Sequence, residues 1–270
     1  MKKLLGIAVG VLSAVGLCAE DVVSDLTLET NVQFQTERVF RGRNEFHKTL
    51  APKVKVGSLV CDGYDIYAGI DAWLDIASKS AFNRISPNIG VSWDVAEIFT
   101  LDGGYKHHFH TAMPKEVKKG DELVSGKRDS GEIYGGVIVD VLLEPSLYCF
   151  YDFGRKEFAI EGRVLYNVDL SQYAFSGLGI DLGAKVGFDH SSKPNGLSYI
   201  ETLGKKSYSY YGVNADLIYE LSNNAKAKFG LAYEGNSAEQ QSWVNGVQDR
   251  GVIPGYRNSL WINASVDCSF

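Results

Sequence analysis

The sequence has no long apolar run after its N-terminal segment, and it has few cysteines. No later stretch reaches the roughly 18 apolar residues that a transmembrane helix needs, whereas a β-strand can cross a membrane with about ten. Cys61, Cys149 and Cys268 follow that segment, and an odd number at wide spacing does not indicate a disulfide framework. Basic residues number 27 against 33 acidic ones, which argues against a nucleic-acid partner. No motif for a cofactor stands out, and we expect none.

The N-terminal segment "MKKLLGIAVGVLSAVGLCAED" has the layout of a secretory signal peptide. Two lysines precede an apolar stretch, which is followed by small residues and then by acids. We expect residues 1–19 to be a signal peptide, with cleavage after Cys18 or Ala19. No linker, low-complexity tract or short repeat divides the remainder, so residues 20–270 are predicted to form one domain.

Apolar residues recur with a period of two along nearly all of this domain. In "GYDIYAGIDAWLDIA", Ile66, Ala68 and Ile70 share one face, and Asp65 and Asp71 lie on the other. This alternation indicates long amphipathic β-strands. About twelve are expected, near residues 25–41, 48–60, 63–77, 82–96, 98–111, 130–144, 147–155, 158–170, 177–190, 207–221, 224–236 and 258–270.

Short connections such as "VCDG" and "LSNN" alternate with long ones, which is typical of a barrel with periplasmic turns and external loops. The link after the seventh strand is too short for this pattern, and "DLSQYAFSG" is too long. Aromatic residues near strand ends suit two interfacial girdles: Tyr64 and Trp93 on one side, Tyr105 and Phe109 on the other.

The predicted fold is therefore all-β: a transmembrane antiparallel up-and-down β-barrel in the bacterial outer membrane, with both termini in the periplasm. A soluble β-sandwich or lipocalin-like barrel also alternates. We consider these alternatives weaker because the polar face is crowded with glycines and with charges of both signs, as though it lined a confined interior.

The last strand, "LWINASVDCSF", alternates up to its final residue, and only Trp261 breaks the pattern. Closure of a barrel explains this, because in lipid the last strand must pair with the first. The terminal Phe270 resembles the C-terminal signal by which bacterial outer-membrane proteins are recognised for assembly. This resemblance implies the barrel-assembly machinery as a partner during biogenesis and outer-membrane lipids as the surroundings.

The segment "NVQFQTERVFRGRNEF" is similar to the opening of porins of the TorF family, in which "FRG" follows an aromatic or apolar pair after a polar-alternating strand. Val39–Gly42 match this motif, whereas Arg38 replaces the usual Tyr. The resemblance implies a membrane barrel and a passive channel. Because an arginine facing lipid costs about 2–4 kcal/mol, we expect Arg41 to face inward or toward a loop. It could form part of a charged constriction or be a structural partner of Glu37 or of an aspartate across the lumen.

Charges of both signs share the polar face, with acids in excess. Buried charges need partners or water, so the lumen is predicted to be either water-filled or plugged by a cross-barrel network. The candidate pore-lining residues are Glu37, Arg41, Lys53, Lys55, Asp71, Asp75, Arg84, Lys106, Arg163, Asp181, Lys185 and Asp216. A narrow acidic pore should prefer cations or small polar solutes. We expect a porin-like channel for passive diffusion of ions or small polar solutes; a plugged structural or adhesive barrel is the alternative.

The motif "YKHHFHT" leaves two further interpretations open. His108 and His110 share the lumen face and could share a metal, although no third ligand is identified. His107, His110 and the serines of 111–130 could instead belong to a membrane-embedded lipid-processing enzyme. No nucleophile motif accompanies them, so we predict neither a catalytic nor a metal site.

Overall fold

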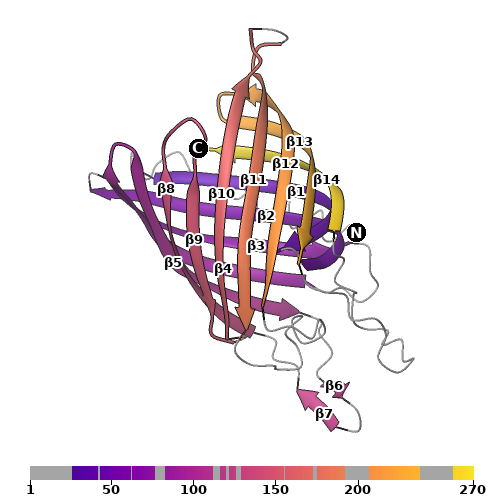
Figure 1. The fold of residues 1–270 in the computed structure, drawn as a ribbon. Coiled ribbons are helices and arrows are strands. Elements are labelled where there is room, and N and C mark those ends of the chain that lie inside the picture. The colour runs from indigo at the N-terminus through magenta and orange to yellow at the C-terminus, as the bar shows by residue number, and fades with distance from the viewer. Residues whose placement is uncertain are drawn as a thin grey trace.

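The computed structural model is a closed barrel of twelve antiparallel strands, which confirms the predicted fold class (Figure 1). It describes residues 26–41, 43–61, 63–76, 83–111, 116–119, 122–125, 129–154, 156–172, 175–191, 207–237 and 258–270, so the expected signal peptide lies outside the described residues. The barrel strands are β1 (Leu26–Phe40), β2 (Arg43–Cys61), β3 (Tyr64–Asp75), β4 (Asn83–Ala96), β5 (Phe99–Thr111), β8 (Asp129–Val139), β9 (Ser146–Asp152), β10 (Glu157–Asp169), β11 (Leu178–Ser191), β12 (Ser207–Ser222), β13 (Ala225–Asn236) and β14 (Asn258–Ser269). Between β5 and β8, β6 (Glu116–Lys119) and β7 (Glu122–Ser125) form a separate two-stranded sheet.

The connections lie on two rims, because consecutive barrel strands pair in antiparallel order and β14 closes on β1. We call one the turn rim; it carries the start of β1, the end of β14 and the connections β2–β3, β4–β5, β8–β9, β10–β11 and β12–β13. The opposite loop rim carries the connections β1–β2, β3–β4, β5–β8, β9–β10, β11–β12 and β13–β14. The two connections expected to be exceptions to the pattern of short turns and long loops remain exceptions: the short β9–β10 link is on the loop rim, and the long β10–β11 link is on the turn rim.

Strand closure extends to the last residue of the chain. The Phe270 N–H donates to the Leu28 carbonyl at 2.9 Å, and the Leu28 N–H donates to the Phe270 carbonyl at 2.9 Å. The alternation therefore continues to the C-terminus because every residue there pairs with β1. Trp261, which breaks the alternation, is buried with Val39 and Ala232. Its position on the polar parity places an aromatic ring in the interior instead of on the outer surface.

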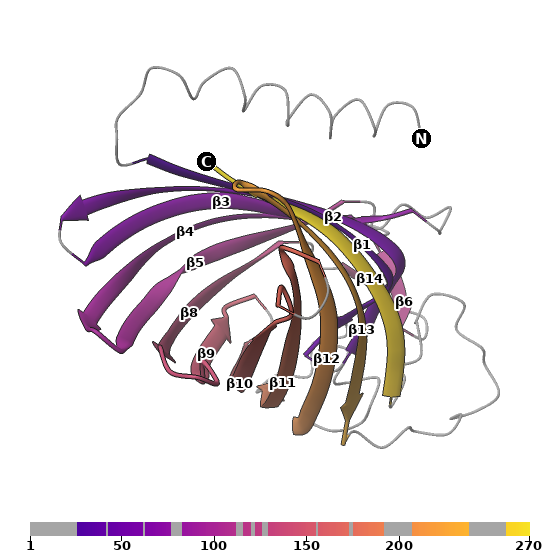
Figure 2. The ribbon, with the colours of Figure 1, turned by 90° about the horizontal axis from the view of Figure 1, so that it is seen from above.

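The two walls of the barrel run in different directions. In Figure 1, β9–β12 run upright in front, while β2–β4 run across behind them. Seen from above, the strands arch around one interior (Figure 2). Long strands with strong tilt bring the inward side chains of opposite walls together, which is the geometry that positions the site described below.

The outer surface is apolar along the length of the strands. Ile70 on β3 is 53% exposed, and Val213 and Leu231 on the adjacent strands β12 and β13 are 55% and 50% exposed. Such a band suits lipid better than water. Among the residues that the structure describes, none belongs to a helix long and apolar enough to cross a membrane.

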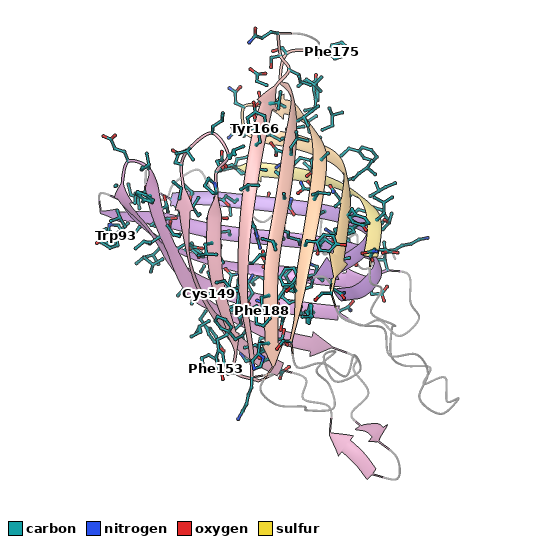
Figure 3. All side chains as sticks on the ribbon, viewed as in Figure 1. Trp93, Cys149, Phe153, Tyr166, Phe175 and Phe188 are labelled. Atoms are coloured by element: carbon teal, nitrogen blue, oxygen red, sulfur yellow. The ribbon has the colours of Figure 1, made fainter. Side chains whose placement is uncertain are left out.

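Aromatic side chains on the outer surface gather toward the rims. Trp93 stacks on Tyr64 with ring centroids 5.1 Å apart near the turn rim. Toward the loop rim, Phe109 and Phe153 are exposed, and Figure 3 shows Trp93 and Phe153 at opposite ends of the barrel. This arrangement agrees with the two predicted groups of aromatic residues.

The strand limits differ from the expected ones by about five residues at two places. β2 begins at Arg43 instead of near residue 48, and β8 ends at Val139 instead of near residue 144. The second difference arises from a turn in which the Val139 N–H bonds to the Pro145 carbonyl at 2.9 Å and Glu144 has a φ of 36°. Leu142 continued the apolar run in the sequence, but it lies 78% exposed in this turn.

Candidate functional site

The barrel interior has two unlike halves. In the half near the loop rim, charged residues are almost completely buried. As whole residues, Arg41, Arg84, Glu132, Asp152, Glu157 and Asp189 are each at most 5% exposed. All lie within a few residues of strand ends on that rim. Buried charges are stable only when they are paired or hydrated, so this half must contain a dense polar network.

The β1–β2 turn carries the Val-Phe-Arg motif into this half. Val39 packs with Trp261, as described above. The Phe40 ring has two guanidinium groups as neighbours, with the guanidinium carbon of Arg41 4.7 Å and that of Arg84 4.9 Å from its centroid. Arg84 also lies 4.3 Å from the Trp73 ring centroid. Cation–π contacts in a desolvated site contribute about 2 kcal/mol each, so the motif helps to fill the lumen with specific contacts.

Arg41 reaches across the lumen to the opposite wall. Its Nη2 donates to Glu132 Oε2 on β8 at 2.7 Å, and its Nη1 lies 3.8 Å from Glu157 Oε1 on β10. The guanidinium carbon is 4.4 Å from the centroid of Phe150 on β9. In the closed strand order these three strands lie opposite β1. The arginine therefore has partners across the lumen, and the ion pairs are with Glu132 and Glu157, which were not among the expected partners.

The backbone of Arg41 is held as firmly as its side chain. The Tyr208 hydroxyl lies 3.0 Å from the Arg41 carbonyl oxygen and 3.3 Å from Asp189 Oδ2. Arg41 has a φ of 50°, a left-handed conformation that costs a non-glycine residue about 1–2 kcal/mol. Burial alone would lower the pKa of Arg41, but Glu132, Glu157 and Asp189 raise it, so the side chain stays charged. We call the surrounding groups the Arg41 cage: Glu132, Phe150, Glu157, Asp189 and Tyr208.

The half near the turn rim is open. A cavity of about 500 Å³ there has side chains of both signs in its lining: Glu29, Lys53, Lys55, Asp71, Lys106, Lys226 and Asp267. A second cavity of about 240 Å³ shares Lys106 with the first and reaches the Arg41 cage at Glu132 and Phe150. The two cavities and the cage thus lie in series. Lysines slightly outnumber acids around the larger cavity, whereas the acids gather in the buried half.

Ion pairs line the wall formed by β1, β2, β3 and β5. Lys106 Nζ donates to Asp71 Oδ2 at 2.8 Å, with both side chains partly buried. Lys55 Nζ lies 3.4 Å from Glu29 Oε1 and 4.8 Å from the Tyr67 ring centroid. These side chains are more exposed than the Arg41 cage, which is expected where water fills the space between the walls.

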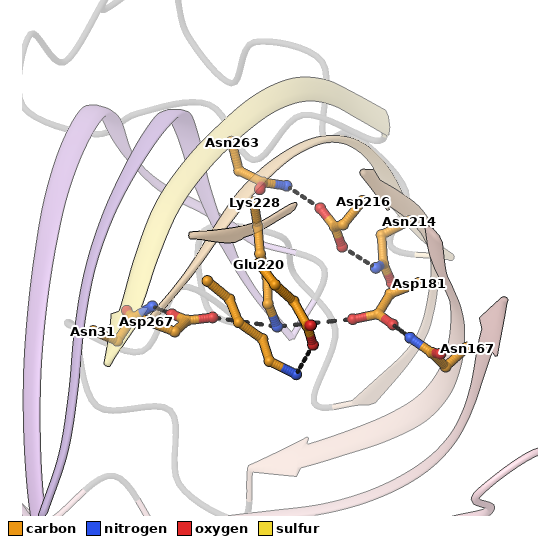
Figure 4. A network of polar contacts seen from close by, with 10 residues as sticks. Asn31, Asn167, Asp181, Asn214, Asp216, Glu220, Lys228, Asn263 and Asp267 are labelled. Carbon is orange, nitrogen blue, oxygen red and sulfur yellow. Dashed lines mark hydrogen bonds and ion pairs between the residues drawn. The ribbon is translucent and has the colours of Figure 1, made fainter. Parts of the chain in front are cut away.

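A second network lines the wall formed by β10–β14 and β1 (Figure 4). Lys228 bridges two strands, with its Nζ 3.3 Å from Asp267 Oδ2 and 3.7 Å from Asp181 Oδ2. Asparagine amides complete the network: Asn31 donates to Asp267, Asn167 to Asp181, and Asn214 and Asn263 to Asp216. Charged and amide groups therefore alternate around this wall, and every carboxylate named here has a donor.

The remaining predicted residues are spread along the interior. Arg163 pairs with Glu161 and lines the second cavity, and Lys185 pairs with Glu234. Glu37 and Asp75 have the inward parity of β1 and β3. The structure brings Lys53, Lys55, Asp71 and Lys106 together around the large cavity. It does not bring the predicted residues into one cluster, and their role in lining a conducting path stays a prediction.

The sequence interpretation missed three buried glutamates: Glu132, Glu157 and Glu234. Strand parity could have found them. Glu132 alternates with outward Ile133 in β8, and Glu157 has the parity of Glu161 in β10. The expected strand began one residue too late to include Glu157. The interpretation also treated the lumen charges as one set, whereas their burial separates two zones.

The histidines of "YKHHFHT" have separate environments. His108 Nδ1 lies 2.8 Å from Ser86 Oγ, and both residues are buried. His107 is beside Tyr105, with 2.8 Å between its Nδ1 and the tyrosine hydroxyl. The side chain of His110 and residues 112–115, 120–121 and 126–128 lie outside the described residues. Within the described ranges, no group of three or more His, Cys, Asp or Glu side chains is placed to hold a metal ion.

Comparison with known proteins gives similarity in fold alone. No protein-family model matches the sequence, and no curated protein matches it. An outer membrane channel from Pseudomonas putida F1 is 7% identical with a TM-score of 0.54, covering 94% of this chain and 98% of that chain. LpxR from Salmonella typhimurium is 10% identical with a TM-score of 0.51, covering 89% of this chain and 99% of that chain. The NanC porin is 12% identical with a TM-score of 0.48, covering 89% and 98%. The first two likenesses place the chain among closed membrane-type β-barrels.

Proposed function

We propose that the protein is a porin-like channel of the bacterial outer membrane for passive diffusion of ions or small polar solutes. The observation that carries this proposal is the contrast between the apolar outer surface and the charged interior, which holds a cavity of about 500 Å³ in series with a second one. An apolar exterior suits lipid, and a charged cavity retains water. The resemblance of Val39–Gly42 to TorF-family porins and the fold of the Pseudomonas putida channel support the same conclusion.

In this proposal the turn rim faces the periplasm, with both termini there, and residues 1–19 direct export. Assembly would use the barrel machinery that reads a C-terminal Phe, and lipids would surround the outer surface. The pore-lining candidates around the large cavity would set ion preference through their charges.

Single-channel recording tests the proposal. Mature protein refolded in detergent and inserted into a planar bilayer should give small, discrete conductance steps, because the loop half of the lumen is narrow. Heat-modifiable migration on gels serves as the control for folding. A folded barrel without conductance, both in the wild type and after Arg41→Ala, would overturn the channel.

A plugged structural barrel is the second candidate, favoured by the buried Arg41 cage. It differs in one measurable respect: removal of cage charges would change its stability without producing current.

A further inference from the structure

The chain's own arginine occupies a site suited to an organic cation. We propose that the Arg41 cage binds solutes carrying a guanidinium or ammonium group, that these compete with Arg41, and that the channel is thereby selective for small organic cations. This inference rests on the proposed channel function.

The composition of the cage favours such a ligand. Two carboxylates lie against one guanidinium, Glu132 at 2.7 Å and Glu157 at 3.8 Å. A third, Asp189, is joined to the Arg41 backbone through the Tyr208 hydroxyl. The Phe150 ring offers its face at 4.4 Å. Carboxylates with an aromatic face recognise planar cations through charged hydrogen bonds and cation–π contacts.

A solute can reach the cage from the turn rim. The second cavity is lined by Glu132 and Phe150, which belong to the cage, and by Lys106, which also lines the large cavity. Lys106 and Arg163 on this route are paired with Asp71 and Glu161. Their positive charges are therefore compensated, and Lys55 and Lys226 at the large cavity are likewise paired, with Glu29 and Glu220.

Competition has a physical basis, because Arg41 is held in an unfavourable backbone conformation. Its φ of 50° is maintained by the ion pairs and by the Tyr208 hydroxyl 3.0 Å from its carbonyl oxygen. When a solute takes over the carboxylates, Arg41 loses that support and its own backbone can relax. The arginine thus links occupancy of the cage to the opening of the loop half.

The first test uses Arg41→Ala in a planar bilayer. Its unitary conductance should exceed that of the wild type by about twofold or more, because a buried side chain no longer fills the lumen. Guanidinium chloride at millimolar concentration should then block the current, while sodium chloride at the same ionic strength should not. Adding Glu132→Gln to this background should weaken the block about tenfold, the effect of losing about 1.4 kcal/mol of binding. Equal block by guanidinium and sodium would overturn the proposal.

Two further measurements keep the test decisive. If Arg41→Ala does not fold, arginine methyl ester is added to the wild-type channel. It should raise the conductance above that in sodium chloride at matched ionic strength, and no rise would overturn the inference.

If no variant conducts, the channel function fails, and thermal unfolding of folded Arg41→Ala tests the cage alone. Protection by millimolar guanidinium and not by sodium supports the site, and equal melting temperatures refute it.

Discussion

The ion pair between Arg41 and Glu132 should be among the strongest polar interactions of the barrel. The two side chains are 5% and 7% exposed, with 2.7 Å between Nη2 and Oε2. At an effective dielectric constant of about 20, unit charges about 4 Å apart attract by about 4 kcal/mol. Loss of one partner of a buried pair costs about 3–5 kcal/mol, since the other charge is left without compensation. A double-mutant cycle with Arg41→Ala and Glu132→Gln should therefore give a coupling free energy of about 2–4 kcal/mol.

The exposed pair of Lys55 and Glu29 provides the matched control. Its side chains are 39% and 53% exposed, with 3.4 Å between Nζ and Oε1. Solvent screening limits such a pair to about 1 kcal/mol or less. The free energy of unfolding would be measured for both cycles by urea titration in phospholipid vesicles, followed by tryptophan fluorescence. Equal coupling free energies in the two cycles would refute the reasoning that burial strengthens the ion pair of the Arg41 cage.

Three other predictions concern backbone packing, lipid exposure and charge. Gly104→Ala should destabilise the barrel by about 1–3 kcal/mol, because a Cβ there would collide with the Ile89 carbonyl oxygen and the Tyr134 hydroxyl. Gly135→Ala is the control: its Cβ would meet its nearest atom at 3.9 Å, so the unfolding midpoint should change little. Val213→Arg places a charge on the outer surface, where the valine is 55% exposed, and should cost about 2–4 kcal/mol in vesicles but much less in detergent. Charge reversal at Asp71, beside the large cavity, should shift the reversal potential in a salt gradient toward anions, and an unchanged potential would remove it from the conducting path.

The strands could be predicted from sequence because the alternation in a closed barrel is imposed at every residue. One face meets lipid and the other meets the lumen, so a pattern such as that around Ile66–Ile70 leaves one register possible. Closure added a second constraint, and the pairing of Phe270 with Leu28 satisfies it. The predicted end of β8 was wrong because Leu142, an apolar residue in a rim turn, continued the alternation in the sequence without belonging to the strand.

The site was less predictable because parity gives direction and not distance. It assigned Arg41 inward but could not show which of the carboxylates on the opposite wall it would meet. Glu132 on β8 is five strands from β1 by the shorter way round the closed order, and the distance across the lumen depends on the tilt of the whole barrel. Sequence alone also could not show that residues 39–41 would enter the lumen together, since that depends on the left-handed backbone of Arg41.

The division of charge along the barrel has a structural reason beyond transport. Filling the loop half with apolar side chains would close the lumen at lower desolvation cost, but it would make the two faces of each strand alike near one rim. A register slip by one residue would then cost little, because lipid would accept either face. With Arg84, Glu157 and Asp189 buried inside, the same slip would turn fully buried charges toward lipid. The polar filling therefore narrows the lumen and also penalises every misregistered closure of the barrel.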